Sequence, residues 1–162
     1  MPLNKDFEEL FRCLNSVQAK FMVVGAYAVI HYTQPRYTKD IDIWVDPHPE
    51  NAKKIYQALK KFGAPLGKLT LEDLVNPDMV YQIGIEPNRI DILMGIGKLS
   101  FQQAWKNKVV THYGSEKIVL PHLKDLMKAK KEAGRPHDLM DFNLLRKASS
   151  FQKRKNKKNK YS

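Results

Sequence analysis

The 162-residue sequence is long enough for one hydrophobic core and too short for two domains of ordinary size. Its single cysteine, Cys13, excludes an internal disulfide and indicates a packed thiol in a reducing compartment, while a formal net charge of +11 favours anionic partners. Because no apolar run reaches transmembrane length and charged residues stand where a signal peptide needs an apolar run, we expect a soluble, cytoplasmic protein without a membrane partner.

The first part of the sequence predicts helices and strands in alternation. Apolar residues at intervals of three and four indicate a helix from Phe7 to Val17, with Asn4 or Asp6 as its N-terminal cap. The elements that follow are a strand over 21–24, a helix from Gly25 to about Tyr32, a strand over 40–45, and a helix that opens at 47–50 and ends at Gly63.

The second part combines short strands with helices. Glu86-Pro87-Asn88 has the composition of a connection between two paired strands. The expected elements are a helical turn over 71–75, strands over 79–85 and 89–94, a short helix over 101–105, strands over 108–112 and 117–120, and closing helices over 121–133 and 136–148. This mixture predicts an α+β, or mixed α/β, fold.

The end of the sequence carries most of the net charge. Of the 28 Lys and Arg residues, eight lie in 146–162, where no acidic residue occurs, so the rest of the chain has 20 basic against 17 acidic residues. We therefore divide the chain into a domain over 1–148 and a basic tail over 149–162, which is predicted to be disordered. Such a tail can bind a polyanion such as RNA, or it can serve only as a solvated end.

Three aspartates in two predicted strands are spaced for metal binding. Asp40 and Asp42 alternate with aliphatic residues, so in a strand the acids share one face and the aliphatic side chains the other. Paired carboxylates on one strand suit Mg²⁺, which prefers hard oxygen ligands and leaves positions for substrate phosphates. Asp91, in the later strand over 89–94, would complete a cluster of three. The alternative is a charged sheet face or edge that discourages aggregation.

The turn at Gly25-Ala26 is a candidate phosphate site. A strand, a tight turn and a helix in this order present backbone N–H groups to an anion, and a glycine permits close approach. Ala26 keeps its N–H, but its methyl group narrows that approach. Arg36 and Thr38, just before the strand of Asp40, supply a guanidinium and a hydroxyl for phosphate oxygens. An ordinary turn glycine and solvated surface side chains are the alternatives.

Two charged residues in the closing helices lie on apolar faces. Lys130 shares the apolar face of its predicted helix, so its stem points inward. Such a lysine either pairs with an anion or extends its amino group to water. Asp138 lies in the first turn of the last predicted helix, on the face of Phe142, where an acid also favours the helix dipole without any catalytic role.

Several segments, in their order and spacing, resemble a known family. They are Gly25–Val29, Pro35–Val45, Phe62–Gly67, Gln82–Gly84, Arg89–Leu93 and Lys130–Asp141. Together they resemble the polymerase-β-like nucleotidyltransferases, most closely the AbiEii-type nucleotidyltransferase-like proteins, which include toxins of type IV toxin–antitoxin systems. The sequence departs from the wider fold at Ala26, where a second Gly or a Ser is usual.

The resemblance implies a Mg²⁺-dependent nucleotidyltransferase that moves a nucleoside monophosphate from a nucleoside triphosphate (NTP) to a hydroxyl acceptor, an RNA end being one candidate. It implies two Mg²⁺ ions in the active complex and a cognate antitoxin protein as a partner. The implied metal ligands are the catalytic residues Asp40, Asp42 and Asp91. Two further catalytic residues are implied: Lys130, which would contact the triphosphate, and Asp138, which would position Lys130 or the attacking group. The residues that would bind the nucleotide are Gly25, Ala26, Arg36, Thr38 and Lys130. The alternative is a catalytically weakened domain of the same fold that binds nucleotide, RNA or a protein.

Overall fold

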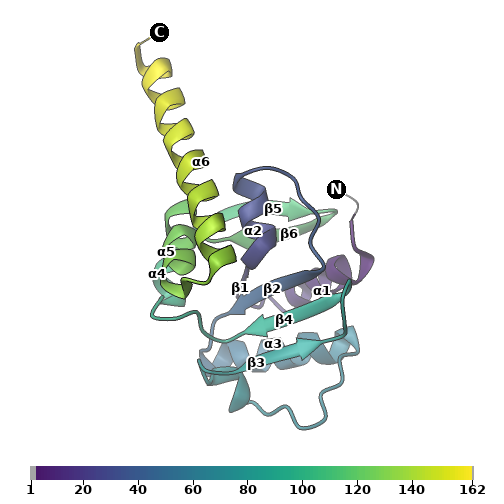
Figure 1. The fold of residues 1–162 in the computed structure, drawn as a ribbon. Helices are drawn as coiled ribbons and strands as arrows, with labels where there is room; N and C mark the ends of the chain where they lie inside the picture. The colour runs from purple at the N-terminus through teal and green to yellow at the C-terminus, as the bar shows by residue number, and fades with distance from the viewer. Residues whose placement is uncertain (1–2, 162) are drawn as a thin grey trace.

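The computed structural model describes residues 3–161 and has a four-stranded mixed sheet at its centre (Figure 1). The strands are β1 (Phe21–Val24), β2 (Asp40–Val45), β3 (Val80–Ile83) and β4 (Arg89–Leu93). Their order is β1–β2–β4–β3, with β2 parallel to β4 and the other two pairs antiparallel. The four ranges agree with the predicted strands within two residues at each end, and the mixed sheet with its helices confirms the α+β class.

Two helices cover one face of this sheet. Figure 1 shows α1 (Lys5–Ser16) and α3 (Pro49–Phe62) behind the strands, where their apolar residues form the main hydrophobic core with the sheet. Asn4 caps α1, because its side-chain oxygen accepts hydrogen bonds from the first N–H groups of the helix. Gly63 ends α3 in the left-handed conformation, with φ of +89°. Both ends agree with the sequence prediction.

The remaining elements pack around the sheet and its two helices. They are α2 (Gly25–Tyr32), the 3₁₀ helix η1 (Asp73–Val75), α4 (Phe101–Lys106), the hairpin of β5 (Val109–Tyr113) and β6 (Glu116–Leu120), α5 (Leu123–Ala133) and α6 (Pro136–Tyr161). Of these, α2, α5 and α6 pack against one another, and Figure 1 shows them above the sheet. Trp44 and Phe101 pack against each other in a second, smaller core.

Helix α6 is longer than the sequence predicted. It continues through residues 149–161, where disorder was expected, and Figure 1 shows its end projecting from the body. Lys, Arg and Gln are good helix formers, and no Gly or Pro interrupts this stretch, so helical backbone is locally compatible. The division at residue 148 therefore falls inside a helix and stays a prediction; Ser162 lies outside the described residues. Neither α6 nor any other described helix combines the length and apolar character needed to cross a membrane.

Candidate metal and nucleotide site

Three carboxylates meet at the centre of the sheet because β2 and β4 are parallel neighbours. The register pairs Asp42 with Asp91 and Asp40 with Arg89. Side chains two residues apart share a face, so Asp40, Asp42 and Asp91 all lie on the same side of the two strands. One oxygen from each carboxylate lies within 4.8 Å of the others. The structure thus brings Asp91 together with the two acids that the sequence placed in another strand.

The electrostatics of this cluster suit a divalent cation. Burial, followed by repulsion from Asp40 and Asp91, raises the pKa of Asp42 from 3.8 to about 7. Asp91 is only 8% exposed, and its Oδ1 is buried without a hydrogen-bond partner. Three close acids with an unsatisfied buried oxygen are the hard donor set that Mg²⁺ requires. The residues present therefore fit the implied magnesium site.

Gly25 opens α2 at the edge of the cluster. Its φ of +66° is in the left-handed region that favours glycine, and a Cβ at this position would lie 2.0 Å from Oδ2 of Asp42. The antiparallel pairing of β1 with β2 places Val24 opposite Asp42, which brings the start of α2 beside the acid. The fold itself therefore requires glycine at this position, even without a ligand. Ala26 follows it and lines the same cleft as the three acids.

Lys130 is held by two buried acids from the start of α6. Its Nζ lies 3.1 Å from Oδ2 of Asp141 and 3.4 Å from Oδ1 of Asp138, and its side chain is 14% exposed. The amino group thus lies among carboxylates, not in bulk water. Asp138 also accepts a 2.6 Å hydrogen bond from Nε of Arg135. Burial alone would raise the pKa of Asp138, but the hydrogen bond with Arg135 and the charge of Lys130 lower it.

Arg36 and Thr38 lie at the same cleft, each with a protein partner. Nη1 of Arg36 is 3.0 Å from Oδ1 of Asp141, and the Thr38 hydroxyl donates to the carbonyl of Asp40. Thr38 therefore stabilises the entry to β2, while Arg36 adds a second cation beside Asp141. Both residues line the cleft, as the sequence analysis expected; their contact with a nucleotide stays a prediction.

Arg89 is a member of the site that the sequence analysis did not single out. Its Nη2 lies 2.5 Å from Oδ2 of Asp40, and its Nε lies 3.4 Å from Oδ1 of Asp91. The signal was present in the sequence, since Arg89 and Asp91 are two residues apart in one strand and so share a face. Arg135 and Asp141 were noticed only as parts of a matching segment, and the structure adds them to the cluster around Lys130.

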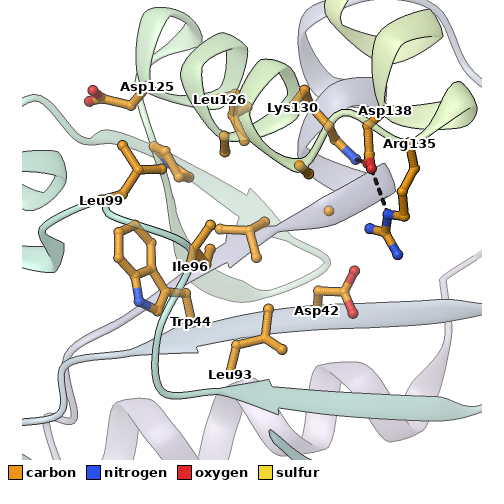
Figure 2. Close-up of a pocket in the computed structure, with 15 residues that line it drawn as sticks. Asp42, Trp44, Leu93, Ile96, Leu99, Asp125, Leu126, Lys130, Arg135 and Asp138 are labelled. Atoms are coloured by element: carbon orange, nitrogen blue, oxygen red, sulfur yellow. Dashed lines mark hydrogen bonds and ion pairs between the residues drawn. The ribbon is translucent and has the colours of Figure 1, made fainter. Parts of the chain in front are cut away.

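A polar cleft and an apolar pocket adjoin at Asp42. The cleft, of about 750 Å³, contains the three acids with Ala26 and Lys130. The pocket, of about 150 Å³, lies between the sheet and α5 (Figure 2). Its apolar walls come from Trp44, Leu93, Ile96, Leu99, Leu126 and Ala129, and Asp42, Lys130 and Arg135 line both spaces. An apolar group can therefore bind directly beside the acidic cluster.

Comparison with solved structures identifies a protein of similar fold. The lincosamide antibiotic adenylyltransferase LnuA, in its lincomycin-bound crystal structure, matches with a TM-score of 0.57 and 17% sequence identity. The match covers 90% of this chain and 98% of that chain. Searches of protein-family models and of curated proteins gave no match. The similarity extends over nearly the whole of both chains and establishes a nucleotidyltransferase fold; the AbiEii-type resemblance stays a prediction.

Proposed function

We propose that this protein is a Mg²⁺-dependent nucleotidyltransferase, which moves a nucleoside monophosphate from an NTP to a hydroxyl group. The observation that carries the proposal is the cluster of Asp40, Asp42 and Asp91, whose oxygens lie within 4.8 Å of one another. The cluster occupies a cleft that Ala26, at the start of α2, and Lys130 also line. The fold shared with LnuA supports the same activity.

Each part of the cleft has a role in this reaction. Bound magnesium ions would stabilise charge on the attacking and leaving oxygens. Asp40, Asp42 and Asp91 would hold them, and the N–H groups of Gly25 and Ala26 would donate to phosphate oxygens. Three of the cationic groups that line the cleft would balance the remaining charge of the triphosphate. These are Arg36, Lys130 and Arg135, with Asp138 and Asp141 positioning Lys130.

ATP is the first donor to test. LnuA is described as an adenylyltransferase, and its fold covers nearly the whole of this chain. The apolar pocket beside Asp42 can receive the apolar part of a nucleoside or of a small acceptor. A small hydroxyl compound is therefore one candidate acceptor.

An RNA end is the other candidate acceptor. The exposed final turns of α6 carry six Lys and Arg residues between 153 and 160, which provide an anion-binding surface. We also propose a role as a toxin with a cognate antitoxin protein, and this proposal rests on the sequence resemblance alone.

The second candidate function is nucleotide binding without transfer, by a catalytically weakened domain. Two features favour it. Ala26 stands where the wider fold usually has Gly or Ser, and Arg89 already pairs with Asp40 and Asp91. In this case a triphosphate would bind in the cleft and remain intact.

Incubation with labelled nucleotides separates the two functions. The pure protein is incubated with Mg²⁺ and each α-labelled NTP, with total RNA in one arm and a small-molecule extract in the other. If label is transferred by the wild type and not by Asp42→Asn, the result supports the nucleotidyltransferase. The labelled product also identifies both the donor and the acceptor class. Calorimetric binding of NTP with no labelled product in either arm supports the binding domain.

A further inference from the structure

Arg89 already contacts two of the three carboxylates that a metal would need. Its guanidinium contacts Oδ2 of Asp40 at 2.5 Å and Oδ1 of Asp91 at 3.4 Å, and these residues provide two of the three carboxylates of the cluster. The contacts follow from the strand register, which pairs Arg89 with Asp40 directly and leaves Asp91 two residues along the same strand. They are therefore built into the sheet.

We propose that Arg89 is an internal competitor of the metal: its guanidinium neutralises Asp40 and Asp91 while the site holds no cation, and metal binding displaces it. The inference rests on the metal site of the proposed function. Three carboxylates this close repel one another, and a cation among them is required for all three to be charged together. A guanidinium and a divalent ion on the same oxygens would repel each other, so one must leave when the other binds.

The contacts of Arg89 are suited to displacement. Its Nε is buried without a hydrogen-bond partner, since the 3.4 Å approach to Asp91 does not meet hydrogen-bond geometry. The pairing is thus less than fully satisfied in the metal-free protein. An alternative partner is also near: Nη1 of Arg89 lies 3.5 Å from Oε1 of Glu86, whose side chain is about half exposed. After displacement the guanidinium can keep this contact and turn toward the open cleft that both residues line.

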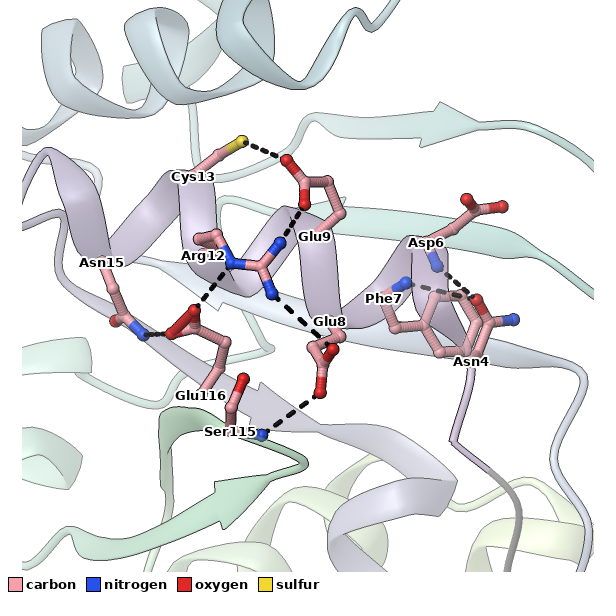
Figure 3. A network of polar contacts seen from close by, with 10 residues as sticks. All are labelled: Asn4, Asp6, Phe7, Glu8, Glu9, Arg12, Cys13, Asn15, Ser115 and Glu116. Atoms are coloured by element: carbon pink, nitrogen blue, oxygen red, sulfur yellow. Dashed lines mark hydrogen bonds and ion pairs between the residues drawn. The ribbon is translucent and has the colours of Figure 1, made fainter.

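A second arginine provides a matched control. Arg12, on α1, also contacts three carboxylates, those of Glu8, Glu9 and Glu116 (Figure 3). None of these residues lines the cleft of the acidic cluster. Among residues 3–161, the acidic group arranged for a metal is the one at Asp40, Asp42 and Asp91. Removing Arg12 therefore deletes an equal charge from an acidic network without touching the metal site.

The experiment measures Mn²⁺ affinity by calorimetry, without nucleotide, for the wild type, Arg89→Gln and Arg12→Gln. If Arg89 competes with the metal, Arg89→Gln binds Mn²⁺ about tenfold more tightly or better, and Arg12→Gln stays within about twofold of the wild type. A second readout is the melting temperature with EDTA and with Mg²⁺. Arg89→Gln should melt lower than the wild type in EDTA and gain more from Mg²⁺, because Asp40 and Asp91 then lose the guanidinium that pairs with them.

The possible results separate the inference from the proposed function. If the wild type binds Mn²⁺ and a folded Arg89→Gln binds it equally or more weakly, Arg89 only supports the ligands. This result would overturn the inference. No Mn²⁺ binding by any of the three proteins removes the metal site, and both ideas fall. If Arg89→Gln binds Mn²⁺ more tightly but the wild type transfers no nucleotide from any NTP, the role of Arg89 is supported and the proposed function is contradicted.

Discussion

A Cβ atom on residue 25 would lie 2.0 Å from Oδ2 of Asp42, so the glycine that opens α2 makes room for the aspartate at the centre of the acidic cluster. The backbone of Gly25 also has φ of +66°, a conformation that residues other than glycine rarely adopt. Steric space and backbone conformation therefore both require glycine at this one position, where the sheet, the helix and the candidate metal ligands meet.

Gly25→Ala should destabilise the fold by about 2 kcal/mol or more and weaken Mn²⁺ binding, because the methyl group displaces the Asp42 carboxylate and the backbone is strained. Urea unfolding and calorimetry measure the two effects. Gly63→Ala is the matched control, since Gly63 also has a left-handed φ but no atom within 4 Å of an added Cβ. It should lose only about 1 kcal/mol and bind Mn²⁺ normally. Equal behaviour of the two variants would contradict the steric role of Gly25.

Asp42→Asn should abolish nucleotidyl transfer while leaving the protein folded. The amide preserves the shape of the side chain but is a poor metal ligand, so we expect activity to fall by more than about a hundredfold. In EDTA at pH 8 the variant should melt above the wild type, because it removes one of three mutually repelling charges. Single-turnover transfer within a few fold of the wild type would contradict the metal assignment.

The stability of the metal-free protein should depend on the titration of Asp42. Its pKa is about 7 in the folded protein, against an ordinary value of 3.8. Between these pH values the folded state keeps a proton that the unfolded state has lost, so the free energy of unfolding should fall as pH rises from about 4 to about 7. Urea titrations in EDTA at several pH values measure this slope. Asp42→Asn should flatten it, and an unchanged slope in that variant would assign the dependence to other groups.

Lys130→Met should lose nucleotide affinity and also some stability. Methionine keeps the apolar stem but leaves Asp141 and the 1% exposed Asp138 without the amino group that lies between them. We expect the free energy of unfolding to fall by about 1–3 kcal/mol. The loss should not be larger, because Arg36 and Arg135 still pair with these acids. Chemical unfolding gives the stability, and titration with a non-hydrolysable triphosphate gives the affinity.

A double variant distinguishes the two roles of Lys130. Lys130→Met with Asp141→Asn removes a cation together with one of its acids, so most of the stability should return while the triphosphate affinity stays low. If the double variant regains affinity along with stability, Lys130 acts only through the fold and does not contact the nucleotide.

Deleting residues 149–162 should leave the melting temperature almost unchanged and weaken RNA binding. The deletion removes six Lys and Arg residues, and the segment is exposed over 152–160. If these residues neutralise RNA phosphates, the slope of log affinity against log salt should flatten by roughly 0.7 for each single-strand phosphate that the truncated protein no longer binds. Identical affinity and slope for the full-length and truncated proteins would make the segment a solvated end and weaken the case for an RNA acceptor.

Much of the architecture was readable from local patterns. The alternation of Asp40 and Asp42 with aliphatic residues predicted their strand, and Asn4 and Gly63 marked helix ends correctly, because caps depend on only a few neighbouring residues. The end of α6 was the main difference. Its polar composition and lack of an apolar period suggested disorder, whereas the structure continues the helix through Tyr161.

The sequence by itself determined which residues share a face of a strand or helix, and so placed Asp40 with Asp42 and turned Lys130 inward. Only the tertiary structure decided which faces meet. The parallel register of β2 and β4 brings Asp91 opposite Asp42 and Arg89 opposite Asp40, and the packing of α5 against α6 places Lys130 between Asp138 and Asp141. Strand register and helix packing are set by contacts between residues far apart in the chain, which no local period encodes.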